Sequence, residues 1–244
     1  MNFKLKKSGF TLSEVMITLT LIGALATLTL STIGASVQQR ARLAEFRSAY
    51  AKMEATLKSI QFDRGSVYAC YYGTVPFDDI DEQGLRMKKK SVSDATVECN
   101  KFIHDFTRAM GATHSCENNP ITEGCIPNNY PASGCSSYDF KKAKRAYVFD
   151  NSMIFMTYHT PNQSDFPGRM AIDINGRKGP NKWGQDIFPL SLSVHETAIV
   201  NNKTYVKEVY FTQPNLTDDF YRKCFINGTG KTTKEMMKES AGFR

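Results

Sequence analysis

The sequence predicts an α+β protein, in which a long N-terminal helix packs on a C-terminal antiparallel β-sheet that carries disulfide-bearing loops. Three observations predict this class. Residues 10–37 form a long, predominantly apolar run that carries a single charge, on Glu14. Apolar side chains then recur at helical spacing as far as Ile60. After residue 145, short segments rich in β-branched and aromatic residues alternate with turn residues, as in a sheet.

The apolar segment 10–37 is longer than the roughly 20 residues that a helix needs to span a bilayer. In hydrocarbon the backbone must satisfy its own hydrogen bonds, so we expect a transmembrane helix there. Lys4, Lys6 and Lys7 precede it and all the cysteines follow it, which predicts a cytoplasmic N-terminus and an external C-terminal body.

The predicted helix continues beyond the apolar segment, because no Pro or Gly interrupts the chain between Gly34 and Gly65. One continuous helix of about 50 residues would be roughly 75 Å long. Over residues 38–62 it is amphipathic, with an apolar stripe at spacings of three and four residues. The members of the stripe are Leu43, Phe46, Tyr50, Met53, Leu57 and Ile60.

Glu14 has two interpretations at this stage. A carboxylate inside an apolar segment is costly and calls for a partner, which favours a contact with a neighbouring subunit. Thr11 and Glu14, however, also have the spacing of a capping box at a helix N-terminus. The residues themselves leave both interpretations open.

The stretch Lys6-Lys7-Ser8-Gly9-Phe10-Thr11-Leu12-Ser13-Glu14, followed by about 20 apolar residues, resembles the N-terminus of type IV prepilins and pseudopilins. Ser13-Glu14-Val15-Met16 stands where Leu-Ile-Glu-Leu-Met is commoner in that family. The resemblance covers residues 4–60.

The resemblance implies cleavage between Gly9 and Phe10 by a prepilin peptidase, and N-methylation of Phe10. Glu14 would neutralise the N-terminal amine of an adjacent subunit during assembly. Implied partners are copies of the chain or other pilin-like subunits, the peptidase and an inner-membrane assembly platform. The chain would be stored in the bacterial inner membrane and then enter a type IV pilus or a type II secretion pseudopilus.

The expected divisions of the chain are a leader (1–9), a transmembrane and filament-core helix (10–37), its amphipathic continuation (38–62) and a globular pilin-like head (63–244). In the head we expect a loop over 63–90, a short helix over 93–110 and a polar tail from Lys231 that is frayed or helical. The predicted strands are 146–149 and 152–158, joined as a hairpin, then 169–174, 190–194 and 203–212.

An even number of cysteines, all after the apolar segment, predicts disulfides formed in an oxidising compartment. The six are Cys70, Cys99, Cys116, Cys125, Cys135 and Cys224. They allow fifteen pairings, and zinc is disfavoured because no C-x2-C or H-x3-H spacing occurs. Residues 115–137 hold three of them in a turn-rich stretch, which we expect to be an exposed loop.

Asp173, Asn175 and Asp186 offer oxygen atoms of the kind that Ca²⁺ prefers, which makes them a weak candidate calcium site. The EF-hand spacing is absent, and Asn-Gly followed by Gly-Pro-Asn is ordinary turn chemistry, so a turn is favoured. The segment also resembles a D-x-N-G-x-x-G-P-N loop of some bacterial pilin-like proteins. Beyond this we expect no cofactor.

No catalytic motif is present: G-x-S-x-G, H-E-x-x-H and P-loop patterns are all missing from the sequence. His104 and His114 are expected to be surface residues, and an enzyme would have to assemble a site from scattered groups such as His159, His195 and Asp186. We therefore expect a structural subunit and not an enzyme.

The formal charge of +7 is partly that of the N-terminal lysines, and the runs 88–90 and 141–145 are expected to be solvated. These lysines are not interleaved with aromatic residues, so no specific nucleic-acid partner is expected.

Two other functions stay open. One is a secreted soluble protein with a signal peptide cut after Ala35. The other is a static membrane anchor that never polymerises.

Overall fold

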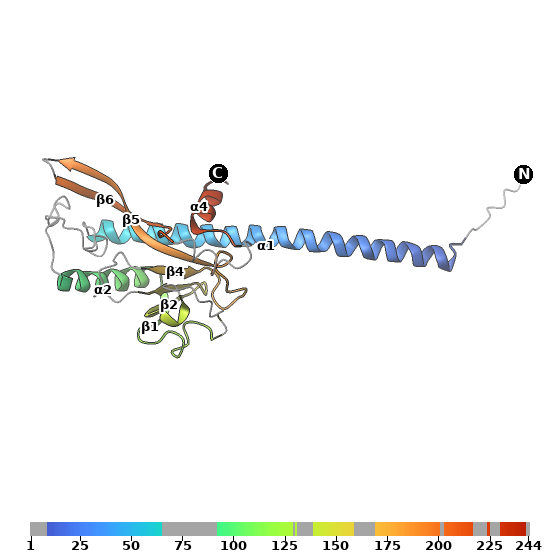
Figure 1. Ribbon diagram of the computed structural model, residues 1–244, viewed down its shortest axis with the longest axis horizontal. Helices are drawn as coiled ribbons and strands as arrows, with labels where there is room; N and C mark the ends of the chain where they lie inside the picture. The colour runs from blue at the N-terminus through green and yellow to red at the C-terminus, as the bar shows by residue number, and fades with distance from the viewer. Residues whose placement is uncertain are drawn as a thin grey trace, which may run out of the picture. The chain divides into compact units, whose positions relative to one another are not determined.

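The computed structural model describes residues 9–64, 92–128, 130, 139–158, 169–200, 203–216, 224 and 230–242. The chain forms two compact units, residues 1–42 and 43–244. The helices and strands follow in the order α1 (Leu12–Arg64), α2 (Val92–Ala109), β1 (Ala112–Cys116), η3 (Phe140–Lys142), β2 (Arg145–Phe149), β3 (Ile154–Thr157), β4 (Met170–Asp173), β5 (Ile187–Val200), β6 (Lys203–Thr212) and α4 (Thr233–Gly242) (Figure 1).

The first unit is helical from Leu12 onward, as predicted, and belongs to α1, which has 53 residues. Within the part of the chain that the structure describes, no helix is both long and apolar enough to cross a membrane. The transmembrane segment expected over residues 10–37 stays a prediction.

The second unit contains a six-stranded antiparallel sheet in which every strand pairs with the next one in sequence, from β1 to β6. The predicted hairpin is confirmed as β2–β3, with Tyr147 opposite Phe155. β4 pairs with residues 187–190 of β5, and β6 pairs along its length with residues 191–200 of β5. The last two strands therefore continue as a two-stranded ribbon. β5 is longer than the strand predicted over 190–194, whereas β6 has the predicted bounds 203–212.

One face of the sheet is covered by the second-unit part of α1 and by α2, which confirms the predicted helix-on-sheet packing (Figure 1). Phe46, Met53 and Leu57 of the α1 stripe are fully buried. Phe106 of α2 lies 5.4 Å, between ring centroids, from both Phe155 and Phe211. Helix α2 matches the predicted helix 93–110, and the tail from Lys231 contains α4.

The other face of the sheet is covered as well, which was not predicted from the sequence. Side chains alternate between the two faces along each strand. All four residues of β3 are buried, so both faces of the sheet are covered at this strand. Ile126, Tyr130, Phe140 and Trp183 form a second core on this side, together with the cysteines of a disulfide.

This second core corrects in part the expectation that residues 115–137 form an exposed loop, since some of the described positions there are exposed and others are buried. Of the positions that the structure describes there, Cys116, Cys125, Ile126 and Tyr130 are buried. Residues 112–116 also form an unpredicted edge strand. The physical reason is that the face of the sheet opposite α1 and α2 is also apolar. The free energy is lower when this segment covers that face than when both stay in contact with water. The loop expected over 63–90 lies mostly outside the described residues.

Helix α1 also protects the outer edge of the sheet at β6. The Tyr50 hydroxyl donates a hydrogen bond to the carbonyl oxygen of Phe211 (2.7 Å), and the Phe211 amide donates to Glu54 Oε1 (2.6 Å). An edge strand otherwise exposes unpaired backbone groups. These two side chains satisfy both groups of one residue and tie α1 to the sheet by more than apolar contact.

Candidate functional site

The N-terminal site is built on the first turn of α1. The Thr11 amide and the Thr11 hydroxyl each donate a hydrogen bond of 2.8 Å to Glu14 Oε2. The Glu14 amide in turn donates to Thr11 Oγ1 at 3.3 Å. This is the reciprocal pattern of a capping box, in which a threonine and a glutamate satisfy the free amides of a helix start. The capping interpretation of Glu14 is therefore confirmed. Its contact with a neighbouring subunit stays a prediction.

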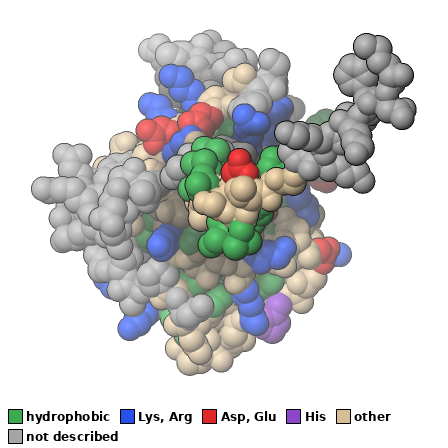
Figure 2. Space-filling model, turned by 90° about the vertical axis from the view of Figure 1, so that its right-hand side faces the viewer, with side chains coloured by type: hydrophobic (Ala, Val, Ile, Leu, Met, Phe, Trp, Pro, Cys, Tyr) green, Lys and Arg blue, Asp and Glu red, His purple; other side chains and the backbone are tan. Residues whose placement is uncertain are grey.

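The helix that follows the cap exposes its apolar side chains on all sides. Phe10 is 87% exposed and Leu12 is 80% exposed. The other large apolar side chains exposed over this stretch are Val15, Met16, Ile17, Leu19, Leu21, Ile22 and Leu25. Figure 2 faces this end of the helix and shows hydrophobic side chains gathered around it, with an acidic side chain among them. Such a surface is far from what a soluble monomer exposes, so it indicates a site for burial against other molecules.

Gly9 precedes the cap at a position where the fold does not require a glycine. No described atom outside its chain neighbours lies within 4 Å of the position that a Cβ would take, and its backbone is not in the left-handed region. A side chain would therefore fit here without strain.

Comparison with known proteins identifies this stretch. Residues 4–30 match the family model of the prokaryotic N-terminal methylation motif. The chain carries the prepilin-type signal of type IV pilins and pseudopilins. The match includes Gly9, Phe10 and Glu14, the residues singled out from the sequence. The predicted α+β pilin-like class is confirmed by the N-terminal helix, the six-stranded antiparallel sheet and the disulfide between Cys116 and Cys125. No curated protein and no solved structure matches the chain.

A second group of polar residues lies buried in the head, where a calcium site was considered. Asp173 and Asp186 are both fully buried. Asp173 Oδ1 accepts from the amides of Asn175 (3.1 Å) and Gly176 (2.7 Å), and its Oδ2 accepts from the hydroxyl of Tyr130. The two oxygens of Asp186 accept from the amides of Asn181 and Lys182, each at 2.7 Å.

These contacts test how well the residues fit a cation. The amide oxygens of Asn175 and Asn181 are buried without a hydrogen-bond partner among the described atoms, which would suit a cation. All four carboxylate oxygens of Asp173 and Asp186, however, already face N–H or O–H donors. Calcium would have to displace those donors, so the geometry favours the turn interpretation. At Gly176, where φ is +62°, a Cβ would overlap the carbonyl oxygen of Ser152.

Asp173 has a pKa raised to about 7, chiefly because burial disfavours its charged form, and the charge of Asp186 adds to this effect. The unfolded pKa is about 3.9. A raised folded pKa means that this group stabilises the fold fully below pH 4 and that this stabilisation is lost as pH rises through 7. The partner Tyr130 lies 43 residues away in sequence, and no pattern in the sequence indicates the pair.

We expect Asp173→Asn to retain the fold and to flatten the decline in the free energy of unfolding between pH 4 and pH 7.5. The amide oxygen can accept from Asn175 and Gly176, and the amide nitrogen can donate to Tyr130. Asp186→Asn is the matched control. Its amide nitrogen must face a backbone N–H, which costs about 1–3 kcal/mol at every pH.

Chemical unfolding of the full chain at several pH values measures both effects. An Asp173→Asn protein that keeps the wild-type pH slope, or that loses as much stability as Asp186→Asn, would refute this interpretation.

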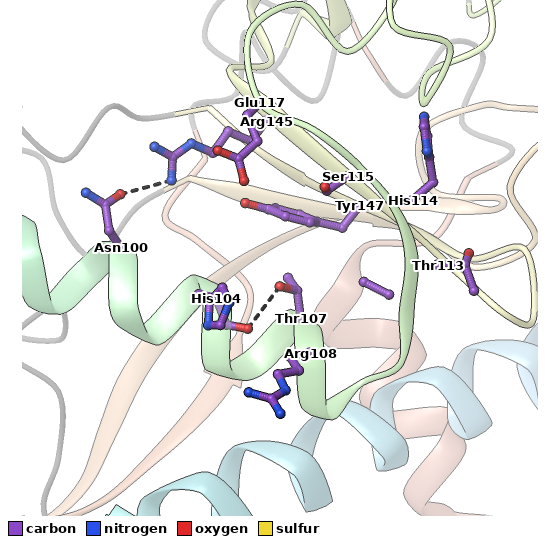
Figure 3. Close-up of a pocket in the computed structure, with 11 residues that line it drawn as sticks. Asn100, His104, Thr107, Arg108, Thr113, His114, Ser115, Glu117, Arg145 and Tyr147 are labelled. Atoms are coloured by element: carbon purple, nitrogen blue, oxygen red, sulfur yellow. Dashed lines mark hydrogen bonds between the residues drawn. The ribbon is translucent and has the colours of Figure 1, made fainter.

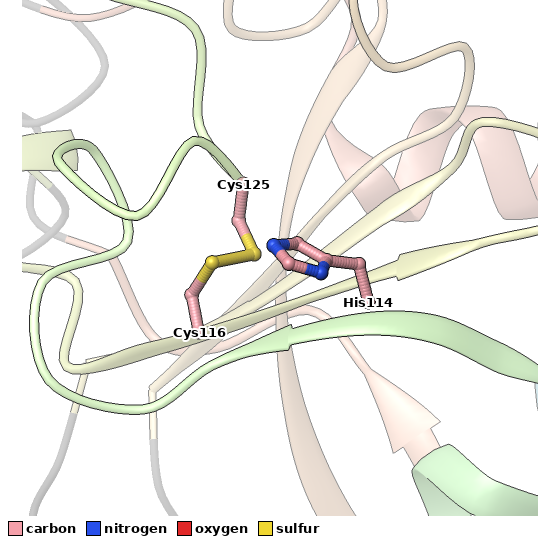
Figure 4. Close-up of side chains that lie close together, drawn as sticks. All are labelled: His114, Cys116 and Cys125. Atoms are coloured by element: carbon pink, nitrogen blue, oxygen red, sulfur yellow. A yellow bond between two sulfur atoms is a disulfide. The ribbon is translucent and has the colours of Figure 1, made fainter.

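The cysteines form disulfides wherever the structure describes their side chains. Cys116 and Cys125 are joined, and Cys224 is also disulfide-bonded. His114 lies beside the first pair, within 4.8 Å of its sulfur atoms (Figure 4). Because both sulfurs are bonded to each other, they are not thiolates and this group does not hold a metal. Cys70, Cys135 and the side chain of Cys99 lie outside the described residues.

The structure assembles no catalytic site from the histidines that it describes. His104 and His114 are exposed, as expected. His159 and the side chain of His195 lie outside the described residues. Of that scattered set only Asp186 has a described side chain, and it holds a turn.

Proposed function

We propose that this protein is a structural subunit of a type IV pilus or a type II secretion pseudopilus, assembled through its N-terminal helix. The observation that carries the proposal is the coincidence of two features on one segment. Residues 4–30 match the N-terminal methylation motif, and the helix within that match exposes apolar side chains on all sides. A helix of this kind needs other helices or a lipid phase around it.

In the proposed maturation, a prepilin peptidase cuts between Gly9 and Phe10, and the new N-terminus of Phe10 is methylated. Glu14 then lies in the first turn of the mature helix, where its charge can pair with the amine of a neighbouring subunit. Burial drives the bundling, since each Leu, Ile or Met side chain removed from water contributes about 1.5–3 kcal/mol. The Thr11 cap holds the carboxylate in position and leaves one of its oxygens without a capping role.

The prepilin motif also implies anchoring in the bacterial inner membrane before assembly. On this proposal residues 1–9 are the leader, 10–37 form the membrane and filament-core helix, 38–62 its amphipathic continuation, and 63–244 the head. Proteins with this motif usually have no enzymatic activity, in keeping with a purely structural role. The partners would be pilin-like subunits, the peptidase and an assembly platform.

Site-specific photo-cross-linking tests this function in the native host. Leu19, which is 63% exposed, is replaced by a photoreactive amino acid, and adducts are identified by mass spectrometry after illumination. We expect adducts with a second chain that carries the same N-terminal motif. The same substitution combined with Glu14→Ala should lose them. Adducts confined to lipid would instead support a static anchor.

A further inference from the structure

The head contains an open groove between α2 and the first two strands of the sheet, with a volume of about 480 Å³. Grooves of roughly 300–1,000 Å³ are the usual size of small-molecule sites. Polar and apolar surface contribute about equally to its lining, whereas the faces that hold the fold together are apolar. The lining includes Asn100 and His104 of α2, Ser115 of β1, Arg145 and Tyr147 of β2, and Glu117, which directly follows β1.

The fold holds these side chains in fixed relative positions. Asn100 and His104 are one helical turn apart on α2, so they share a face of that helix. Ser115 of β1 lies directly opposite Tyr147 of β2 in the sheet register. Arg145 Nη1 donates a 2.9 Å hydrogen bond to Asn100 Oδ1, which joins the two walls. Figure 3 shows this bond across the groove, with Glu117 beside Arg145 and the Tyr147 side chain between the helix and β1.

The charges of the lining restrict the kind of ligand. Arg108 and Arg145 oppose a cationic ligand, and Glu117 opposes an anionic one. Burial raises the pKa of Tyr147, so its hydroxyl stays neutral and both donates and accepts. The groove thus offers guanidinium and amide donors, a carboxylate acceptor and the hydroxyls of Ser115 and Tyr147 within one site. A ligand rich in hydroxyl groups matches this mixture, because each hydroxyl also donates and accepts.

We propose that the groove between α2 and β1–β2 binds a short neutral oligosaccharide through Asn100, Glu117, Arg145 and the hydroxyls of Ser115 and Tyr147. This activity goes beyond the structural role, and it rests on a part of the molecule remote in sequence from the methylation motif. Its test is independent of filament assembly.

The test uses the full chain purified in a detergent without a sugar headgroup. An array of short glucose, mannose, galactose and N-acetylglucosamine oligomers is screened for binding, and the dissociation constant of the tightest binder is then measured by calorimetry. Glu117→Gln and Ser115→Ala each remove one polar partner at an exposed position. We expect each to weaken binding roughly tenfold, as for loss of one hydrogen bond. Lys101→Ala, at an exposed position of α2 outside the groove, is the control and should bind as the wild type does.

Melting temperatures of all variants establish that each one is folded. The proposal is overturned if no oligomer on the array binds, or if binding is the same in Glu117→Gln, Ser115→Ala and the wild type. It is also overturned if inorganic phosphate displaces the sugar and Glu117→Gln binds phosphate more tightly, since the groove would then be an anion site.

Discussion

Glu14→Gln is expected to remove the chain from filaments while leaving the start of its helix intact. The amide oxygen of glutamine can still accept from the Thr11 amide and hydroxyl, so the capping box survives. What is lost is the negative charge that the proposed assembly pairs with a neighbouring N-terminal amine. Breaking a buried ion pair by removing one partner costs about 3–5 kcal/mol. We therefore expect the recovery of the chain in the sheared filament fraction to fall roughly a hundredfold or more.

Thr11→Ala separates charge pairing from capping, because it weakens the cap and keeps the charge of Glu14. It removes the hydroxyl that accepts from the Glu14 amide but leaves the carboxylate charged. The loss of the cap costs about 0.5–2 kcal/mol of helix stability, and we expect filaments to form. If Thr11→Ala abolishes assembly while Glu14→Gln assembles normally, capping is the whole role of Glu14 and the charge-pairing proposal is wrong.

Phe106→Ala is expected to lower the free energy of unfolding of the head by about 3–5 kcal/mol, the usual cost of removing a buried phenylalanine ring. Phe106 is fully buried, and its ring contacts those of Phe102, Phe155 and Phe211, which belong to α2 and to two strands. The substitution therefore opens a cavity at the point where helix and sheet meet. Neighbouring rings cannot close it without leaving their own contacts.

Val97→Ala is the matched control for that experiment. Val97 lies on the same helix but is 69% exposed, and we expect a change within about 0.5 kcal/mol. Urea unfolding of both variants, followed by circular dichroism, measures the difference. A Phe106→Ala protein as stable as Val97→Ala would mean that α2 does not pack on the sheet as described.

The features that could be predicted from the sequence are those that depend on residues close together in the chain. The stripe from Leu43 to Ile60 has helical spacing, and the structure buries its Phe46, Met53 and Leu57 against the sheet. The hairpin β2–β3 follows from two apolar runs around Asp150-Asn151. The N-terminal motif is likewise a continuous stretch, so its residues can be identified from their order in the chain alone.

The features that were missed depend on residues far apart in the chain. The disulfide between Cys116 and Cys125 is one of many pairings that the sequence allows, and the contact of Tyr130 with Asp173 spans 43 residues. One sequence pattern could have indicated the second core. Residues 153–156 are apolar at every position, and such a run indicates a strand buried on both faces. The groove draws on α2, β1 and β2, so no single segment of the sequence could indicate it.

The mass of the N-terminal peptide of the mature chain, purified from its native host, tests the central claim most directly. Processing as a prepilin-type subunit predicts a chain that begins at Phe10 and carries one methyl group on its N-terminal nitrogen. The capping box at Thr11 and Glu14 then lies in the first turn after that terminus. A mature chain that begins at Ser36 would contradict the claim, since it would lack the methylated terminus, Glu14 and most of the exposed apolar helix.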